Sequence, residues 1–193
     1  MSEQAVVTGR VVDGVTLPAV GTYDLDVAHT HVGFVVRHMA VSKVRGRFAG
    51  VDGVVEIGDD LADSSVRVTI DADSIDTRDE NRDAHLRSND FFDTATHPTW
   101  TYTSTAVRPT GPGAAAVDGD LTIRGITRPV TLAVTLEGVV QDPYGNHRVG
   151  FSATAEIDRQ DFGVSFGGVM EAGGLVVANT VKIEIEAEAV LRQ

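Results

Sequence analysis

VKIEIEAEA, residues 181–189, alternates apolar and acidic or basic side chains almost without a break. Successive side chains on a β-strand point to opposite faces, so the pattern places one row against a core and the other in water. The stretch therefore predicts a half-buried strand near the end of the chain.

The same period of two recurs along most of the chain and predicts about eight strands. Turn-forming clusters at 58–60, 109–113 and 142–146 separate several of them. Parallel neighbours would need long crossover connections, and only residues 72–98 offer one, so we expect antiparallel pairing and an all-β fold. The other predicted strands fall at about 31–38, 44–57, 66–70, 100–102, 121–123, 130–136 and 149–157.

Both a barrel and a sandwich satisfy this pattern, but closure removes the exposed edges of long strands. We therefore predict an antiparallel up-and-down barrel over residues 21–193, wide enough either to be filled by side chains or to hold one small ligand. Gly46, Gly50 and Gly53 interrupt the 44–57 strand, which indicates a sharp bend. Residues 1–20 are expected to form an arm or an extra edge strand.

The segment 77–100 departs from the strand pattern. Thr77 and Glu80 have the T-x-x-E spacing of a capping box, which predicts a helix from about 78 to 87. Leu86 is the one apolar residue on the predicted inner stripe, so Phe91 and Phe92 must help to hold the helix in place. We expect this short helix to cover one end of the barrel.

Composition excludes several classes of protein. The chain has 16 basic and 28 acidic residues, a net charge of −12, which argues against a nucleic-acid partner. It contains no cysteine, so disulfides, thiolate nucleophiles and Cys-ligated metals are excluded. The N-terminus does not read as a secretory signal and no apolar run is long enough to span a bilayer, so we expect a soluble cytoplasmic protein. The oligomeric state stays open, a homodimer included.

Five segments, taken in order, resemble the pattern of the YceI-like proteins from about residue 22 to 189. They are YDLDVAHTHVGFVVRH, VRGRFAGVDGVVEI, SIDTRDENRDAHLRSNDFFDTATHPTWTYTS, GDLTIRGITRPVTL and IDRQDFGV. The resemblance implies a lipocalin-like barrel with a helix across one end. It also implies an apolar tunnel that binds a polyisoprenoid or another long-chain, fatty-acid-like amphiphile, with no other cofactor. Many members are exported to the periplasm, whereas no export signal is visible here.

The candidate ligand-binding residues fall into three groups. The polar residues Arg82 and His85 on the predicted helix could meet a head group, or belong to a solvated helix face. His38 could do the same from an inward row of its strand, or be a satisfied core histidine. The apolar candidates could line a tunnel or fill a core, and they are Phe34, Val36, Leu86, Phe91, Phe92, Trp100 and Phe162.

Two rival functions remain. His29 and His31 would face the same side of a continuous strand, the geometry of a His/carboxylate metal-dependent enzyme. Alternatively, a barrel with a filled core would act only through its surface. The chain has no G-x-S-x-G elbow, no P-loop and no paired-carboxylate signature. We therefore expect a non-catalytic protein that sequesters or carries a long-chain ligand without covalent chemistry.

Overall fold

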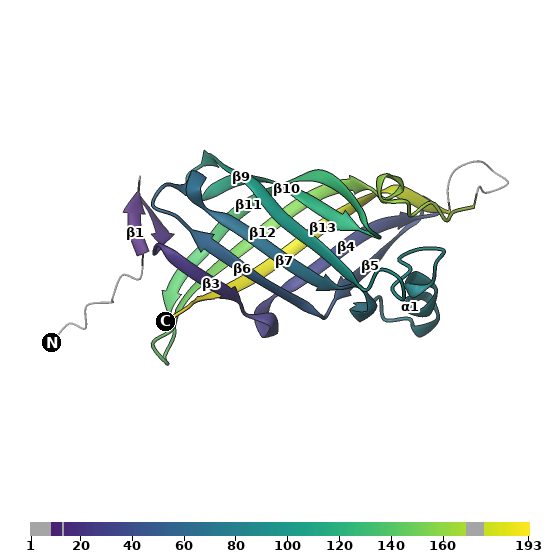
Figure 1. Ribbon diagram of the computed structural model, residues 1–193, viewed down its shortest axis with the longest axis horizontal. Coiled ribbons are helices and arrows are strands. Elements are labelled where there is room, and N and C mark those ends of the chain that lie inside the picture. Colours follow the sequence, from purple (N-terminus) through teal and green to yellow (C-terminus); the bar gives the residue numbers. More distant parts are fainter. Residues whose placement is uncertain (1–8, 13, 169–175) are drawn as a thin grey trace.

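The chain forms a closed antiparallel barrel of eight strands with one short α-helix at one end (Figure 1). The computed structural model describes residues 9–12, 14–168 and 176–193. The barrel segments are β3 (Gly21–Leu25), β4 (His31–His38), β5 (Ser42–Phe48), β6 (Val51–Ile57), β7 (Ser65–Asp71), β8 (Ile75–Asp76), β9 (Thr99–Gly111), β10 (Ala114–Ile123), β11 (Ile126–Gln141), β12 (His147–Asp158) and β13 (Val177–Leu191). The helices are η1 (Val27–His29), η2 (Leu61–Asp63), η3 (Ala72–Ser74), η4 (Arg159–Phe162) and α1 (Glu80–Arg87).

The eleven segments build eight barrel strands, in which β3 and β4, β5 and β6, and β7 and β8 each count as one strand. Each of these eight strands pairs with its neighbours in sequence, which is the predicted up-and-down order. β13 closes the ring, because it pairs with β12 on one side and with β3 and β4 on the other. The fold class, an all-β lipocalin-like barrel with a short helix, is therefore confirmed.

Three of the eight barrel strands are interrupted, which explains why eleven segments build them. β3 and β4 are separated by η1, β5 and β6 by Ala49 and Gly50, and β7 and β8 by η3. The 44–57 stretch is bent in the middle, as its glycines predicted, and the bend at Ala49 and Gly50 divides it into β5 and β6. A Cβ on Gly50 would stand 2.8 Å from the Cβ of Asp71, so the close approach of the two strands at this bend needs a glycine.

The last strand has the alternation predicted from 181–189. Ile183 and Ile185 face the barrel interior, while Lys182 and Glu184 form an ion pair 2.9 Å apart on the outside. The expected half-buried strand is thus confirmed.

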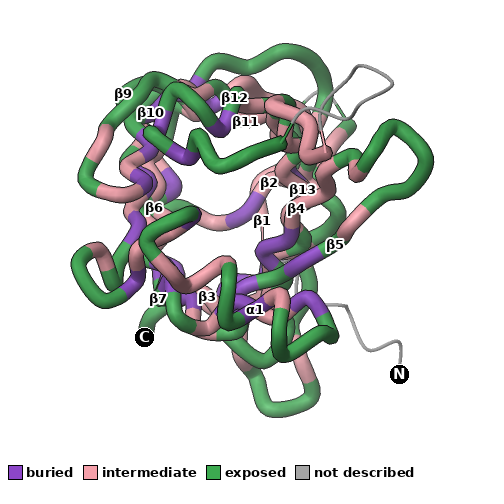
Figure 2. The backbone as a smooth tube through the Cα atoms, turned by 90° about the vertical axis from the view of Figure 1, so that its right-hand side faces the viewer, coloured by how far each residue is buried: buried purple, intermediate pink, exposed green. Residues whose placement is uncertain are grey.

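The segment before the barrel contributes β1 (Gly9–Val12) and β2 (Val15–Pro18), which pair with each other and with no other strand of the described residues. This hairpin lies at the end of the barrel opposite α1 (Figure 1). In Figure 2, which looks along the barrel from the α1 side, the two strands lie inside the outline of the ring. The part of the expected arm that precedes Gly9 lies outside the described residues.

Helix α1 begins later than expected, and its cap is a different residue. Asp79 is the N-cap, and its carboxylate accepts a hydrogen bond from Arg82 N at 3.0 Å. Thr77 instead turns inward, where its backbone N–H donates to Asp83 Oδ1 at 2.9 Å and its hydroxyl donates to the same oxygen. The predicted capping box of Thr77 and Glu80 is therefore wrong, because the buried carboxylate of Asp83 accepts the hydrogen bonds of Thr77. No helix in the described part of the chain is long and apolar enough to cross a membrane.

Candidate functional site

The barrel encloses an apolar cavity of about 890 Å³. Its wall includes residues of the hairpin at one end and of α1 at the other, so the cavity runs the length of the barrel. The inward rows of the strands supply most of the surface, as strand alternation requires. Typical inward residues are Val68, Leu121, Leu132, Val134, Ile183 and Ile185. This open interior contradicts the alternative of a filled-core barrel.

Aromatic rings close the cavity at the α1 end. The ring centroids of Phe48 and Trp100 lie 4.8 Å apart, and those of Phe92 and Trp100 lie 4.7 Å apart in a T-shaped arrangement. Phe34 extends this group, with its ring 6.0 Å from that of Phe48. All four line the cavity and are buried or half-buried. They form an apolar floor, called here the aromatic floor.

The segment that carries α1 is fixed from outside the cavity by hydrogen bonds to backbone. Arg87 Nε donates to Asp73 O at 2.8 Å and its Nη2 donates to Ile75 O at 2.9 Å. Arg82 binds Thr77 through the threonine hydroxyl and carbonyl, at 2.7 and 2.8 Å. These bonds hold the helix so that Leu86, its cavity-lining residue, points inward.

The predicted site residues divide into seven that line the cavity and three that do not. His38, the last residue of β4, is half-buried but does not belong to the lining. Arg82 is engaged with Thr77, and His85 Nε2 lies 2.9 Å from Asp90 Oδ2 on the exposed side of α1. The seven in the lining are Phe34, Val36, Leu86, Phe91, Phe92, Trp100 and Phe162.

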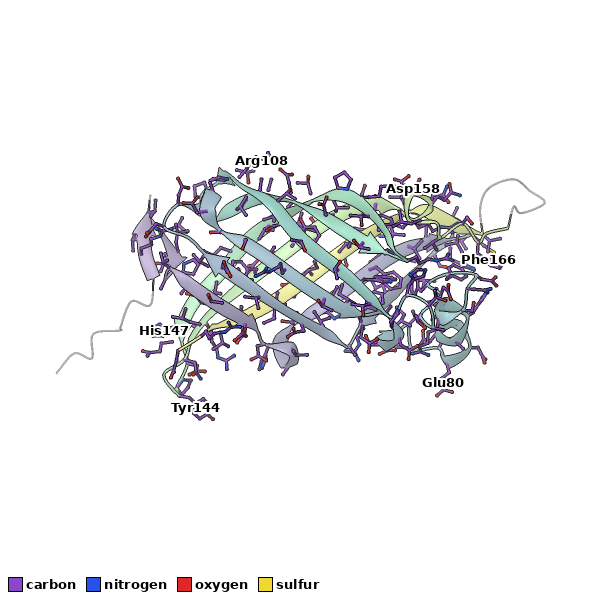
Figure 3. All side chains as sticks on the ribbon, viewed as in Figure 1. Glu80, Arg108, Tyr144, His147, Asp158 and Phe166 are labelled. Carbon is purple, nitrogen blue, oxygen red and sulfur yellow. The ribbon has the colours of Figure 1, made fainter. Side chains whose placement is uncertain are left out.

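Phe166 lies at the same end of the molecule as α1, as Figure 3 shows. Its ring centroid is 4.9 Å from that of His85 and 5.1 Å from that of Phe91. His85 thus packs in an aromatic cluster outside the floor, which accounts for its position without any ligand. The rest of the glycine-rich stretch, residues 169–175, lies outside the described residues.

Most polar groups in the cavity wall are already satisfied. Tyr102 Oη lies 2.9 Å from Val117 O and 3.2 Å from Val130 O, and burial raises the pKa of Tyr102 far above its usual value, so the phenol stays neutral. The buried guanidinium of Arg159 donates to several backbone carbonyls, among them Val164 O at 2.7 Å. Burial also lowers the pKa of Arg159 from its usual value.

Two buried nitrogens of the described lining, Arg10 Nε and Trp100 Nε1, lack a hydrogen-bond partner. Arg10 was missed at the sequence level, because it lies in a segment without a strong pattern. Trp100 was identified as a lining residue, but its unpaired donor could not be read from the sequence.

The histidine pair does not form the metal site of the rival hypothesis. His29 belongs to η1 while His31 begins β4, so the two do not share one continuous strand. His29 lies close to Asp26 and Glu188, in a spacing that could hold a cation. That space is taken by a guanidinium, because Arg148 Nη1 lies 2.7 Å from Asp26 Oδ2 and also contacts Glu188. The cluster is an ion-pair network.

Comparison with known proteins matches residues 23–189 to the YceI-like domain. The chain belongs to the YceI-like family. A UPF0312 protein of Vibrio vulnificus (strain YJ016) is 39% identical over 138 residues, which cover 71% of this chain and 73% of the relative. The hairpin β1–β2 lies before the matched YceI-like region.

Solved structures show the same fold. Burkholderia cenocepacia BcnA superposes with a TM-score of 0.75 at 28% identity, covering 85% of this chain and 98% of that one. A polyisoprenoid binding domain from Saccharophagus degradans, implicated in plant cell wall breakdown, superposes with a TM-score of 0.68. It covers 90% of this chain and all of that one at 17% identity, so it supports the fold alone. Membership of the family and the apolar cavity together indicate a binding role.

Proposed function

We propose that the protein binds a polyisoprenoid or another long-chain amphiphile inside the barrel, to sequester or carry it, and that it does so without catalysis. The observation behind this proposal is the apolar cavity of about 890 Å³ that runs from the aromatic floor to the hairpin. Its volume is near the upper end of the range of about 300–1,000 Å³ common for ligand pockets. A long, narrow apolar space of this kind fits a hydrocarbon chain.

The energetics favour a chain-like ligand. Burying hydrocarbon gains about 0.8 kcal/mol per CH₂, so ten buried carbons supply roughly 8 kcal/mol before the cost of ordering the chain is subtracted. The polar lining contributes less, because Tyr102 and Arg159 already use their donors within the wall. Affinity should therefore depend mainly on chain length.

The family adds support of a general kind. The Saccharophagus degradans structure with this fold is described as a polyisoprenoid binding domain. At 17% identity the shared fold supports a class of ligand, long-chain amphiphiles.

Native mass spectrometry of the purified protein, followed by solvent extraction, tests the proposal. We expect either a co-purified amphiphile or uptake of one added prenyl or acyl chain per barrel. An Ala115→Trp variant should block uptake, because Ala115 lines the cavity. Ala116→Trp is the matched control, since the adjacent residue on β10 faces the other way. Failure of the wild-type protein to take up any chain, or equal uptake by both variants, would contradict the proposal.

A further inference from the structure

The cavity opens at the hairpin end of the barrel. Among the described residues that line it, six are exposed to solvent, and all six lie on the hairpin, on the loop after β6, or at the end of β9 and its turn to β10. The described lining residues at the α1 end are buried or half-buried. A ligand with one polar end would therefore place that end at the hairpin. The six exposed residues are Val12, Asp59, Asp60, Pro109, Gly111 and Pro112.

One face of the hairpin forms part of this mouth. Arg10 pairs with Leu17 and Val12 pairs with Val15, and side chains of paired residues share a face. All four line the cavity, whereas Val11 on the opposite face is 64% exposed. The hairpin thus presents three apolar side chains and one guanidinium to the mouth.

Contacts with the barrel fix the hairpin, which needs them because an isolated two-stranded hairpin is at best marginally stable. Arg10 Nη2 donates to Gly58 O at 2.9 Å, and Nη1 donates to Asp59 O. On the other side Val15 approaches the β9–β10 turn, where a Cβ on Gly113 would stand 3.6 Å from Val15 Cγ1. The hairpin therefore spans from one loop of the mouth to another.

The guanidinium of Arg10 has donors to spare. An arginine has five N–H donors and is always protonated, and two of these donors are used on the carbonyls of Gly58 and Asp59. Nε is buried and has no acceptor among the residues that the structure describes, while the side chain as a whole is 32% exposed. A buried donor without a partner costs free energy, so an oxygen acceptor brought by a ligand would be favoured here.

The charges around Arg10 disfavour a multiply charged head group. Asp59 lies 3.9 Å from Arg10 Nη1, and Asp60 and Asp63 belong to the same loop. Three carboxylates against one guanidinium leave the local charge negative, and the whole chain carries −12. A diphosphate would be repelled, whereas an uncharged oxygen would not.

We propose that Arg10 is the head-group contact of this cavity and selects long-chain ligands that end in an uncharged oxygen acceptor, such as an alcohol or a carbonyl. This inference rests on the proposed function and adds the orientation and the class of head group. Arg10 lies before the region matched by the family, so the selection belongs to the hairpin of this chain.

Three ligands with the same prenyl chain test the inference: geranylgeraniol, its diphosphate and the corresponding hydrocarbon. We expect the wild-type protein to bind the alcohol about tenfold more tightly than the hydrocarbon, and the diphosphate more weakly than the alcohol. In Arg10→Met the ratio between alcohol and hydrocarbon should fall to about one, while hydrocarbon binding persists. This ratio of affinities does not change if a loosened hairpin weakens the binding of every ligand by the same factor.

Two further variants complete the test. Arg124→Met is the matched control, because Arg124 also donates to two carbonyls, Gly163 O and Asn89 O, but does not line the cavity. It should leave the ratio unchanged. Asp59→Asn/Asp60→Asn keeps the side-chain cap of η2 and should strengthen diphosphate binding by about threefold.

An unchanged ratio in Arg10→Met, or a preference of the wild-type protein for the diphosphate, would overturn the inference and leave the proposed function intact. If Arg10→Met weakened the binding of all three ligands equally, Arg10 would only anchor the hairpin, and the inference would also be overturned. If the wild-type protein bound none of the three, the proposed function itself would fail.

Discussion

The two ends of the barrel differ in whether the cavity is closed or open to solvent. At the α1 end, packed aromatic rings and a helix bound to backbone carbonyls close the cavity, and the described lining residues are buried or half-buried. At the hairpin end, the lining includes all six of its exposed residues and a guanidinium that has unused donors. The aromatic floor therefore contributes mainly to the stability of the fold, and the hairpin end mainly to ligand entry. Mutations at the α1 end should change the free energy of unfolding, and mutations at the hairpin end should change ligand binding.

The largest expected effect is on stability, at the aromatic floor. Phe48→Ala removes a ring that is 6% exposed and contacts three others, so it should lower the free energy of unfolding by about 3–5 kcal/mol. Urea denaturation followed by circular dichroism measures the change. Val12→Ala at the mouth, where the side chain is 45% exposed, should cost less than about 1 kcal/mol. Similar losses in both variants would show that the floor is not the more stable end.

The next effect is at the buried carboxylate beside α1. Asp83→Ala leaves the backbone N–H and the hydroxyl of buried Thr77 without their acceptor, which should cost about 2 kcal/mol. Glu80→Ala, at an exposed position of the same helix, should change stability by less than about 0.5 kcal/mol. The same urea denaturation measures both variants. A larger loss of stability in Glu80→Ala than in Asp83→Ala would indicate that Glu80 caps the helix after all.

A pH-dependent effect is expected from the ion-pair network. The guanidinium of Arg148, followed by His29, lowers the pKa of Asp26 to about 2, and Arg148 also lowers the pKa of Asp142. A lowered folded-state pKa stabilises the protein above the unfolded value of about 4, and this contribution is lost as pH falls toward about 2.

Arg148→Met should therefore reduce stability at pH 7, and its difference from the wild type should shrink between about pH 4 and pH 2. Urea midpoints measured across this range give the result. A constant difference at all pH values would mean that the arginine stabilises the fold through packing alone.

The smallest expected effect is on affinity, from the helix residues that were predicted to bind a head group. Arg82→Ala and His85→Ala should each change the affinity for a long-chain alcohol by less than about twofold, because neither side chain lines the cavity. Displacement of a fluorescent fatty ligand measures this. A tenfold loss of affinity in either variant would indicate that the head group binds at the α1 end.

The strand pattern was enough to predict the barrel, because side-chain alternation is a local property that the closed sheet preserves. β4 was predicted with its observed bounds, and the 181–189 alternation gave the inward row of β13. The helix boundary was wrong because the partner of Thr77 is a buried aspartate within the helix. A capping motif in the sequence does not show which of several carboxylates a threonine will reach.

The aromatic candidates of the site were predictable for a related reason. Large apolar residues beside a helix that has little apolar surface of its own have to pack inward, and Phe91, Phe92 and Trp100 do. The polar candidates were harder, since Arg82 and His85 have nearby partners that keep them out of the cavity. Arg10 was missed because its position depends on how the hairpin folds over the far end of the barrel.

Trp100 allows the most direct test of the central claim, because it is the only tryptophan in the chain and lies at the aromatic floor. Long-chain alcohols that carry a nitroxide either near the hydroxyl or near the chain end can be titrated while Trp100 fluorescence is recorded. A chain bound inside the barrel with its head at the hairpin predicts saturable quenching that is much stronger for the label near the chain end. Quenching that does not saturate, or that is stronger for the label near the hydroxyl, would contradict this account.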